Sequence, residues 1–263
     1  MMMNHPRPLK RFGQNYLIDQ NIVRKIVAEF NPQPHDFVLE IGPGTGSLTS
    51  LLQESVGKFY AVEIDKRIIE ELRSKFPKIN FVNDDILKLD LDAFAAGQNK
   101  LRVIGNIPYN ITSPIIFKLI EKREVVQDAV LMVQLEVAKR ITAKEKSKDY
   151  GILGVLLNFF SETNLCFKIS PNVFYPKPKV FSAVVHLKFN KTLPADVSTN
   201  LFIQVVKAAF GNRRKTLKNS LANSKFGEID FSNYNFDLSR RAEELSIDEF
   251  VQLTRLIQKN FEN

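Results

Sequence analysis

Cysteine and histidine are scarce in this chain of 263 residues. Its single cysteine, Cys166, cannot form an internal disulfide and indicates a reducing compartment. The three histidines, His5, His35 and His186, lack the spacing of metal ligands, so we expect no metal site.

Long apolar runs are missing as well. No stretch reaches the roughly 18 apolar residues of a transmembrane helix, and no signal-peptide core follows the first basic residues. The chain also has no internal repeat and no low-complexity tract. We therefore expect a cytoplasmic protein that has no membrane partner.

Among the features that are present, the segment at residues 103–110, Val-Ile-Gly-Asn-Ile-Pro-Tyr-Asn, is the most informative. The side-chain carbonyl of Asn106 and the main-chain carbonyl before or at Pro108 can accept both N–H bonds of an exocyclic adenine amine. The Tyr109 ring can stack on the same purine. Accepting both protons turns the nitrogen lone pair outward, toward an electrophilic methyl group. A strand end followed by a proline turn would produce the same pattern, so further motifs must decide between base methylation and a plain turn.

A glycine-rich turn at residues 42–46 follows an apolar strand and precedes a helix. Glycines there let the backbone approach a ligand closely, at the carboxyl end of a strand, where open α/β sheets bind ligands. The dinucleotide fingerprint is Gly-x-Gly-x-x-Gly, whereas Gly46 comes one residue early and Glu40 lies two residues before Gly42. This spacing departs from the NAD pattern and favours S-adenosylmethionine as the cofactor.

Carboxylates end the next two strands. The strand at residues 59–64 delivers Glu63, in the position that hydrogen-bonds a ribose diol in nucleotide-binding folds, and we expect Asp65 to cap the following helix. The strand after that helix delivers Asp84 and Asp85, either of which could accept the adenine amine of the cofactor. Because these two are adjacent, they point in different directions, and spacing alone does not choose between them.

Together these motifs resemble those of the ribosomal RNA adenine dimethylase family. The similarity spans nearly the whole chain, in the order of the family, at residues 11–19, 42–46, 62–65, 106–110, 136–140, 176–182 and 213–221. It implies a Rossmann-like α/β sheet of the class I S-adenosylmethionine-dependent methyltransferases, with a small carboxyl-terminal all-helical domain. Tyr16, Ile107 and Leu135 depart from the family's Phe, Leu and Lys. None of the three removes a catalytic group, although the missing lysine would weaken an RNA contact.

Roles for individual residues follow from the same resemblance. Cofactor contacts are implied for Asn15, Leu17, Gly42, Glu63, Asp85 and Asn106, so that Asp85 is preferred to Asp84. The family pattern also implies that Phe174 stacks on the target base opposite Tyr109. Stacking contributes about 1 to 3 kcal/mol per base, which offsets most of the cost of unstacking it. Without the flanking motif, Phe174 would be assigned to the core.

The basic balance of the chain agrees with an RNA partner. A net charge of +8 and a pI near 9.4 provide attraction to phosphate that does not depend on sequence. Residues 207–225 hold a cluster of basic side chains and no acid, and further basic runs occur at 7–11 and 139–148. A solvated surface would explain any one run, but three runs favour an RNA-binding rim. The residues predicted to contact RNA are Arg213, Arg214, Lys215 and Lys218.

Strand and helix signals alternate from residue 36 to about residue 123, which is typical of a parallel doubly wound sheet. An amphipathic helix is expected before it at residues 21–30. Apolar runs at 128–135, 155–160 and 180–189 can supply the remaining strands, including an antiparallel edge pair.

Two domains are expected. Residues 1–190 form the catalytic domain, and residues 191–263 form a helical RNA-binding domain after a polar linker at 190–198. Ser246 and Glu249 form a capping box at the start of the last helix.

The resemblance implies a target of two adjacent adenines in the 3′-terminal hairpin of small-subunit rRNA, each dimethylated on a partly assembled subunit by a monomer. A related alternative is the macrolide-resistance type of adenine methylase, which acts on large-subunit rRNA. The motif at residues 213–217 favours the small subunit. A non-catalytic ribosome assembly factor is a second alternative, against which the intact Asn106 and Tyr109 argue. A dehydrogenase is disfavoured by the glycine spacing.

Overall fold

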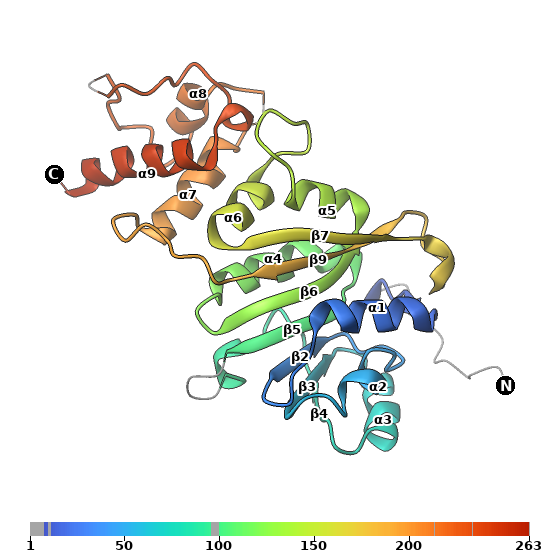
Figure 1. The fold of residues 1–263 in the computed structure, drawn as a ribbon. Helices are drawn as coiled ribbons and strands as arrows, with labels where there is room; N and C mark the ends of the chain where they lie inside the picture. The colour runs from blue at the N-terminus through green and yellow to red at the C-terminus, as the bar shows by residue number, and fades with distance from the viewer. Residues whose placement is uncertain (1–7, 10–11, 96–99, 213, 233, 263) are drawn as a thin grey trace. The chain divides into compact units, whose positions relative to one another are not determined.

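The computed structural model describes residues 8–9, 12–95, 100–212, 214–232 and 234–262 (Figure 1). Its contacts divide the chain into two compact units, Met1–Ala138 with Glu162–Asn190, and Lys139–Ser161 with Lys191–Asn263. The first unit ends at Asn190, and Lys139–Ser161 groups with the carboxyl-terminal helices. A catalytic domain at residues 1–190 and an RNA-binding domain at residues 191–263 remain predictions.

A seven-stranded sheet forms the centre of the first unit, in the order β4-β3-β2-β5-β6-β9-β7. Its strands are β2 (Phe37–Ile41), β3 (Lys58–Glu63), β4 (Asn80–Asn83), β5 (Leu101–Asn106), β6 (Val126–Gln134), β7 (Glu162–Ile169) and β9 (Ser182–Lys188). Strands β2 to β6 are parallel to one another, whereas β9 runs antiparallel to both β6 and β7. The predicted α/β fold with an antiparallel edge pair is confirmed.

The direction in which successive strands are added to the sheet reverses at β2. Strands β3 and β4 follow on one side of β2, and β5 and β6 follow on the other. Open α/β sheets bind ligands at such a switch point, outside the carboxyl ends of the strands. Gly105 lets β5 approach β2 closely there, because a Cβ at that position would lie 2.6 Å from the main-chain oxygen of Ile41. The approach brings the end of β5, at Asn106, beside the turn that follows β2.

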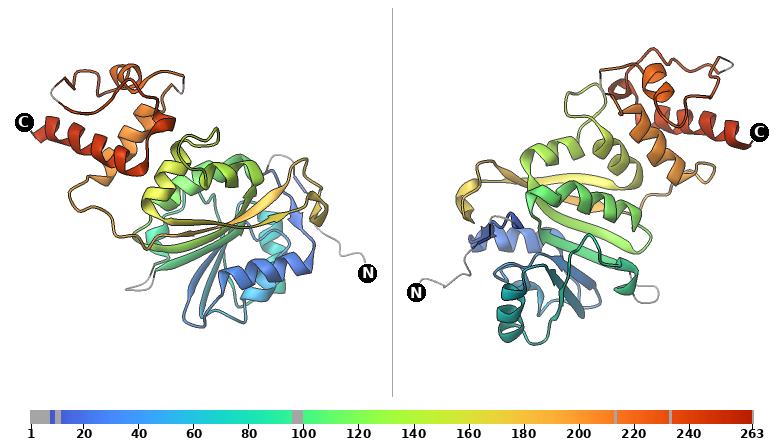
Figure 2. Two further views of the ribbon diagram at one scale, coloured as in Figure 1. Left: turned by 45° about the horizontal axis from the view of Figure 1, so that its top comes forward. Right: turned by 180° about the vertical axis from the view of Figure 1, so that it is seen from behind.

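Helices cover both faces of the sheet (Figure 2). One face is covered by α1 (Gln20–Phe30), α2 (Thr49–Leu52) and α3 (Lys66–Lys75), and the other by α4 (Thr112–Glu121). Helix α1 begins where the Asp19 carboxylate accepts from two main-chain N–H groups, and its helically spaced Val23, Ile26 and Phe30 are buried. Asp65 caps α3 by accepting from Arg67 N. The predicted amphipathic helix and the predicted Asp65 cap are both confirmed.

One run expected to be a strand is a helix. Residues 155–160 belong to α6 (Ile152–Phe160), which is buried on nearly every side. A short continuous apolar run has neither helical nor strand periodicity, so its sequence fits a buried helix as well as a buried strand. The edge strand β7 is formed by the more polar and half-exposed residues that follow.

A second, two-stranded sheet lies beside the main one. It pairs β1 (Tyr16–Leu17) with β8 (Phe174–Tyr175) in antiparallel register, with Tyr16 opposite Tyr175 and Leu17 opposite Phe174. Ile18 N extends the pairing by donating to Val173 O at 2.9 Å. This ties the amino-terminal segment to the connection between β7 and β9.

The second unit is helical. It contains α6, α7 (Thr199–Ala209), α8 (Leu217–Ala222) and α9 (Ile247–Glu262), and α5 (Leu135–Ile141) ends in it. The Phe159 and Phe202 rings stack in its core with centroids 3.8 Å apart. Ser246 and Glu249 exchange hydrogen bonds at the start of α9, so the predicted capping box is confirmed. The predicted linker at 190–198 contains no helix or strand in the described part of the chain.

Short 3₁₀ turns complete the two units. They are η2 (Leu91–Ala93), η3 (Tyr109–Ile111), η4 (Pro171–Val173) and η5 (Ala242–Glu244).

Candidate active site

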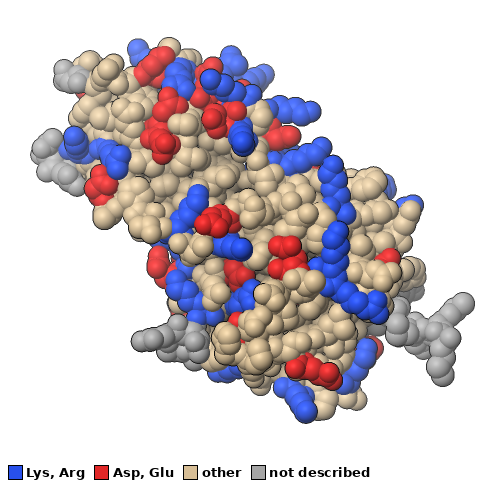
Figure 3. Space-filling model, in the orientation of Figure 1, with Lys and Arg blue, Asp and Glu red and all other residues tan. Residues whose placement is uncertain are grey.

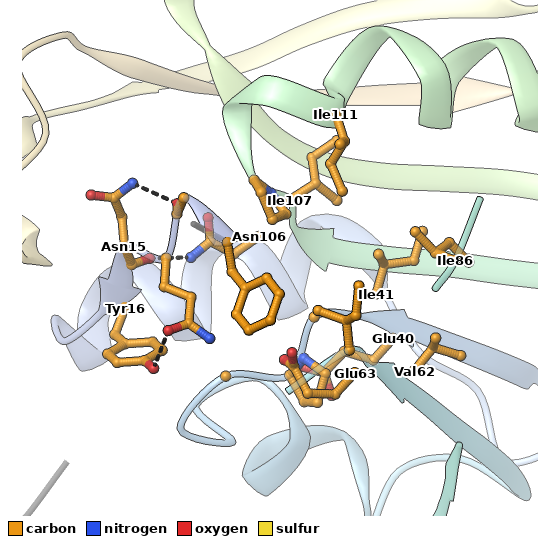
Figure 4. Close-up of a pocket in the computed structure, with 18 of the residues that line it drawn as sticks. Asn15, Tyr16, Glu40, Ile41, Val62, Glu63, Ile86, Asn106, Ile107 and Ile111 are labelled. Carbon is orange, nitrogen blue, oxygen red and sulfur yellow. Dashed lines mark hydrogen bonds between the residues drawn. The ribbon is translucent and has the colours of Figure 1, made fainter. Parts of the chain in front are cut away.

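A cavity opens at the carboxyl ends of β2 to β5, at the switch point of the sheet (Figure 4). Its walls come from the amino-terminal segment up to β1, the turn after β2, the ends of β3 and β4, and the segment after β5. All residues predicted to bind the cofactor line it, namely Asn15, Leu17, Gly42, Glu63, Asp85 and Asn106. Pro108 and Tyr109 line it too.

The glycine turn after β2 exposes bare main chain to this cavity. Gly42 and Gly44 have φ angles of 66° and 55°, in the left-handed region that glycine adopts without a Cβ clash. Gly42 N donates to Val62 O at 2.9 Å, which fixes the turn to β3. A Cβ at Gly44 would lie 3.1 Å from the Tyr16 ring. Glycine is therefore required both by the conformation of the turn and by the close packing around it.

Glu63 ends β3 at the cavity wall and is almost fully buried, with 6% of its surface exposed. Its Oε1 accepts from Asp65 N at 2.9 Å. Burial raises the pKa of the Glu63 carboxyl, against the opposing effect of main-chain donors at Asp65 and Gly44. The nearby Asp65 forms an ion pair with Arg67 at 2.7 Å. The Asp65 charge is thus paired with Arg67, and Glu63 is the buried carboxyl that lines the cavity at this wall.

Glu40 lies under the glycine turn and is 1% exposed. Its Oε2 accepts from the Thr49 hydroxyl at 2.6 Å. Desolvation raises the pKa of Glu40 from 4.5 to about 7, against the Thr49 hydrogen bond, which lowers it. The residue that distinguished this turn from a dinucleotide motif is thus held in place by a threonine from α2.

Asp84 and Asp85 both reach the cavity. Asp84 is exposed, and its Oδ1 accepts from Asp85 N at 2.7 Å. Asp85 is half-buried, and its Oδ1 accepts from Leu87 N at 2.9 Å. Each carboxylate keeps a second oxygen for a ligand, so the geometry is compatible with either residue.

Asn106 is held in place by the amino-terminal segment. Its Nδ2 donates to the main-chain oxygen of Asn15 at 2.8 Å (Figure 4). Asn15 Nδ2 in turn donates to Gly13 O at 3.1 Å, and the Tyr16 hydroxyl donates to Gln14 Oε1 at 3.1 Å. Because the Asn106 bond uses an amide hydrogen, Oδ1 remains as the acceptor of that side chain.

Hydrogen bonds of the main chain after Asn106 distinguish between the two carbonyls that the sequence offered as acceptors for the target amine, those of Ile107 and Pro108. Pro108 O accepts from Ile111 N at 3.2 Å and from the Thr112 hydroxyl at 3.3 Å. These two bonds use both lone pairs of that oxygen. The carbonyl before Pro108, which is that of Ile107, is therefore the better acceptor for a ligand.

Tyr109 is anchored across the sheet. Its hydroxyl and that of Ser182, the first residue of β9, lie 2.7 Å apart. Burial raises the pKa of Tyr109, so the phenol stays protonated at neutral pH. The bond fixes the edge of a ring that lines the cavity.

Phe174 is not among the described residues that line the cavity. Phe174 is 3% exposed and belongs to the buried core cluster that also contains Val23, Ile169 and Val184. The structure thus brings Asn106, Pro108 and Tyr109 together but keeps Phe174 apart. A stacking role for Phe174 requires its ring to leave this packing.

The model of the ribosomal RNA adenine dimethylase family matches residues 7–259. The chain belongs to this family.

Several relatives carry the same name, ribosomal RNA small subunit methyltransferase A. That of Chlorobium phaeobacteroides is 46% identical over 249 residues, which cover 95% of this chain and 91% of the relative. That of Francisella tularensis subsp. novicida is 42% identical over 253 residues, which cover 94% and 97%. These matches span both units of this dimethylase.

Two solved structures share the fold. A dimethyladenosine transferase from Plasmodium falciparum superimposes with a TM-score of 0.74 at 25% identity, covering 94% of this chain and 98% of that one. The 23S rRNA methyltransferase ErmE gives a TM-score of 0.66 at 25% identity, covering 93% and 98%. The fold alone does not separate the two kinds of RNA target, whereas the sequence identities favour the small-subunit relatives.

The residues predicted to bind RNA lie in the second unit of the dimethylase. Arg214, Lys215 and Lys218 are exposed at and just before α8, and Arg213 lies outside the described residues. The Thr216 side chain caps α8 by accepting from Asn219 N. Figure 3 shows lysine and arginine side chains standing out from the displayed surface, with acidic side chains between them.

No group of three potential metal-ligating side chains occurs in the described ranges. Within those same ranges, no helix is long and apolar enough to cross a membrane.

Sequence reasoning gave no role to two residues that shape this site. Gln14 joins the Tyr16 hydroxyl to Leu9 N and Asp65, and Ser182 holds Tyr109. Both lie inside motifs shared with the family, at residues 11–19 and 176–182, so their position in a motif was the available signal.

Proposed function

We propose that this dimethylase uses S-adenosylmethionine to dimethylate the exocyclic amines of two adjacent adenines in the 3′-terminal hairpin of small-subunit rRNA. One observation carries the proposal: the Asn106 amide is fixed by Asn15 O at the wall of the cavity, which Tyr109 also lines. Family membership, and relatives named as small-subunit methyltransferases at 42% and 46% identity, support the choice of RNA.

The cavity fits the proposed cofactor. The bare main chain of the Gly42 turn allows close approach, the buried Glu63 carboxylate would accept from the ribose hydroxyls, and Asp85 would accept from the cofactor's adenine amine. Asn15 and Leu17 would contact it from the amino-terminal segment. When bound, S-adenosylmethionine supplies a methyl group activated by the sulfonium.

The target amine would be held by two acceptors. Asn106 Oδ1 and the Ile107 carbonyl would each accept one N–H bond, which directs the nitrogen lone pair away from both. Positioning is the main contribution of the protein, since a methylated amine is acidic enough to release its proton to solvent. No side chain has to act as a base.

A second transfer to the same nitrogen changes this arrangement. After the first methyl group is added, one N–H bond remains, so only one of the two acceptors can stay engaged. The pocket must therefore let the monomethylated amine turn. Asn106 Oδ1 is held in position by the hydrogen bond from Asn106 Nδ2 to Asn15 O. We infer that Asn106 keeps the contact through both transfers.

Aromatic rings would hold the purine. Tyr109, tethered through Ser182, lines the cavity and would stack on one face of the purine. Phe174 would clamp the opposite face after leaving its packing in the core, as part of closure around the flipped base.

RNA capture would rest on both units. Arg213, Arg214, Lys215 and Lys218 of the helical unit would contact phosphates of a partly assembled small subunit in the cytoplasm. We propose that the protein acts as a monomer.

Methylation of isolated ribosomal particles tests the proposal. The protein is incubated with labelled S-adenosylmethionine and, in separate reactions, unmethylated small subunits or unmethylated large-subunit rRNA, and nucleosides are identified by mass spectrometry. We expect dimethyladenosine from the small subunits alone. Product only from large-subunit rRNA would transfer the assignment to the resistance methylases. Tight subunit binding without product would favour an assembly factor.

A further inference from the structure

The connection between β7 and β9 carries exposed aromatic rings. Within residues 175–181, here called the strap, Tyr175 is 54% exposed and Phe181 is 53% exposed. Val180 between them is 43% exposed. Burial of tyrosine and phenylalanine rings is energetically favourable. Two half-exposed rings on one short segment therefore indicate a surface that binds a partner.

Topology places the strap at the same edge of the sheet as the cavity. Strand β9 is antiparallel to β6 and β7 is antiparallel to β9, so β7 runs in the direction of the parallel strands. The segment after β7 therefore lies at the carboxyl ends of those strands, as the loop beyond β7 in Figure 1 illustrates.

Both ends of the strap are tied to the site. At one end, Tyr175 lies directly opposite Tyr16, whose ring lines the cavity. Directly opposite residues of an antiparallel pair project to the same side. At the other end, Phe181 precedes Ser182, which bonds the Tyr109 hydroxyl at 2.7 Å. The two exposed rings thus flank the place proposed for the target adenine.

The charge of the strap indicates which kind of partner it binds. Lys177 and Lys179 are exposed between the two rings, and no acidic residue occurs anywhere in residues 163–195. Among the described residues, neither lysine forms an ion pair with a carboxylate. Lysine is depleted at the centre of protein interfaces, whereas alternating cations and aromatic rings are typical of surfaces that bind single-stranded nucleic acid.

We propose that Tyr175 and Phe181 stack on unpaired nucleotides next to the target adenine, while Lys177 and Lys179 contact the phosphates between them. The inference rests on the proposed function, because the stacked nucleotides are the neighbours of the adenine that is proposed to bind at Asn106. Extruding a base leaves its neighbours without a stacking partner, and the adjacent adenine must wait for its own turn in the pocket. The strap would hold these neighbours in register.

Substitutions that keep an apolar side chain but remove the aromatic face test the stacking. Tyr175→Leu and Phe181→Leu together should raise KM for unmethylated small subunits about tenfold and leave kcat unchanged. The matched pair Tyr175→Phe and Phe181→Tyr keeps both rings, and its KM should stay within about twofold of the wild type. Affinity for S-adenosylhomocysteine and the thermal unfolding temperature should be the same in all three proteins. An unchanged KM in the leucine variant would overturn the proposal.

Fluorescence gives a readout that does not depend on activity. The chain has no tryptophan, so Phe181→Trp introduces a unique fluorophore into the strap. Titration with an unmethylated RNA hairpin that contains the two adjacent adenines should quench it saturably, because a stacked base quenches indole. Phe37→Trp, at the start of β2 and hence at the opposite edge of the sheet, is the matched control and should not respond. Equal responses at the two positions would contradict the strap assignment.

The activity of the wild type distinguishes a failure of the proposed function from a failure of the role proposed for the strap. If the wild type does not methylate small subunits, the proposed function fails. If the wild type is active and the leucine variant matches it, only the role of the strap fails.

Discussion

The cavity of the first unit and the basic loop of the second unit differ in how their side chains are held. The basic loop comprises residues 214–216 and the start of α8, which carries Lys218. At the cavity, Glu40 and Glu63 are buried and Asn106 is bonded to a main-chain oxygen 91 positions away. In the basic loop, Lys215 and Lys218 extend into solvent. The first arrangement fixes atoms in space, and the second provides charge on flexible stems.

This contrast corresponds to two different tasks. Orienting an amine toward a methyl group depends on small displacements, and a misplacement of about 1 Å can reduce a rate about 100-fold. Attraction of RNA phosphates is additive and tolerant of geometry, and salt screens it. Changes at the cavity should therefore act abruptly on chemistry, and changes in the basic loop should act gradually on affinity.

The largest effect is expected for Asn106→Ala. Removing Oδ1 takes away one of two acceptors that orient the amine, so the single-turnover methylation rate should fall about 100-fold or more. Binding to small subunits, measured by filter retention, should be nearly unchanged. Asn164→Ala, which removes an exposed amide on β7, should have no effect on either quantity. Equal losses of rate and binding in Asn106→Ala would contradict the assigned role.

A smaller effect is expected from the buried carboxyl of Glu40. Its folded-state pKa is raised to about 7 from the ordinary value of 4.5, so between these pH values the folded protein binds a proton more tightly than the unfolded chain does. Stability should therefore fall as pH rises through this window, by about 3 kcal/mol from this group. Glu40→Gln stays neutral and should lack that loss.

Urea unfolding at pH 5 and pH 8 measures the difference. The wild type should lose about 3 kcal/mol more than Glu40→Gln between the two pH values. Glu70→Gln, on the exposed surface of α3, is the matched control and should follow the wild type. Parallel pH profiles of wild type and Glu40→Gln would mean that the carboxyl is already ionised in the folded protein.

The smallest effect is expected in the basic loop. Lys215→Gln and Lys218→Gln should each weaken RNA binding only a few-fold and reduce the slope of log affinity against log salt by about one. Binding measured at several salt concentrations checks this. Lys259→Gln on α9 is the matched exposed control, and a slope change there of the same size would remove the distinction between the loop and the general surface.

The positions of the residues that line the cavity could be predicted from the sequence. The turn at Gly42 and the cap at Asp65 follow from local rules, because each is decided by residues within one turn of chain. Parallel strands then bring Glu63 and Asn106 to the same edge without any further information. Local sequence pattern and strand order are therefore sufficient to predict where these residues lie.

Long-range contacts account for what the sequence did not predict. The bonds of Asn106 to Asn15 and of Tyr109 to Ser182 join segments that are remote in the chain. The apolar run in α6 fits both helix and strand, so only its packing decides. Phe174 belongs to a family motif, but its burial depends on the register between β1 and β8.

Steady-state kinetics on unmethylated small subunits tests most directly the claim that the cavity performs the chemistry and the basic loop performs capture. The account predicts that Asn106→Ala lowers kcat with KM near the wild-type value. It predicts that the double variant Lys215→Gln with Lys218→Gln raises KM and reaches the wild-type kcat at saturation. Loss of kcat in the lysine variant, or a change in KM alone in Asn106→Ala, would contradict it.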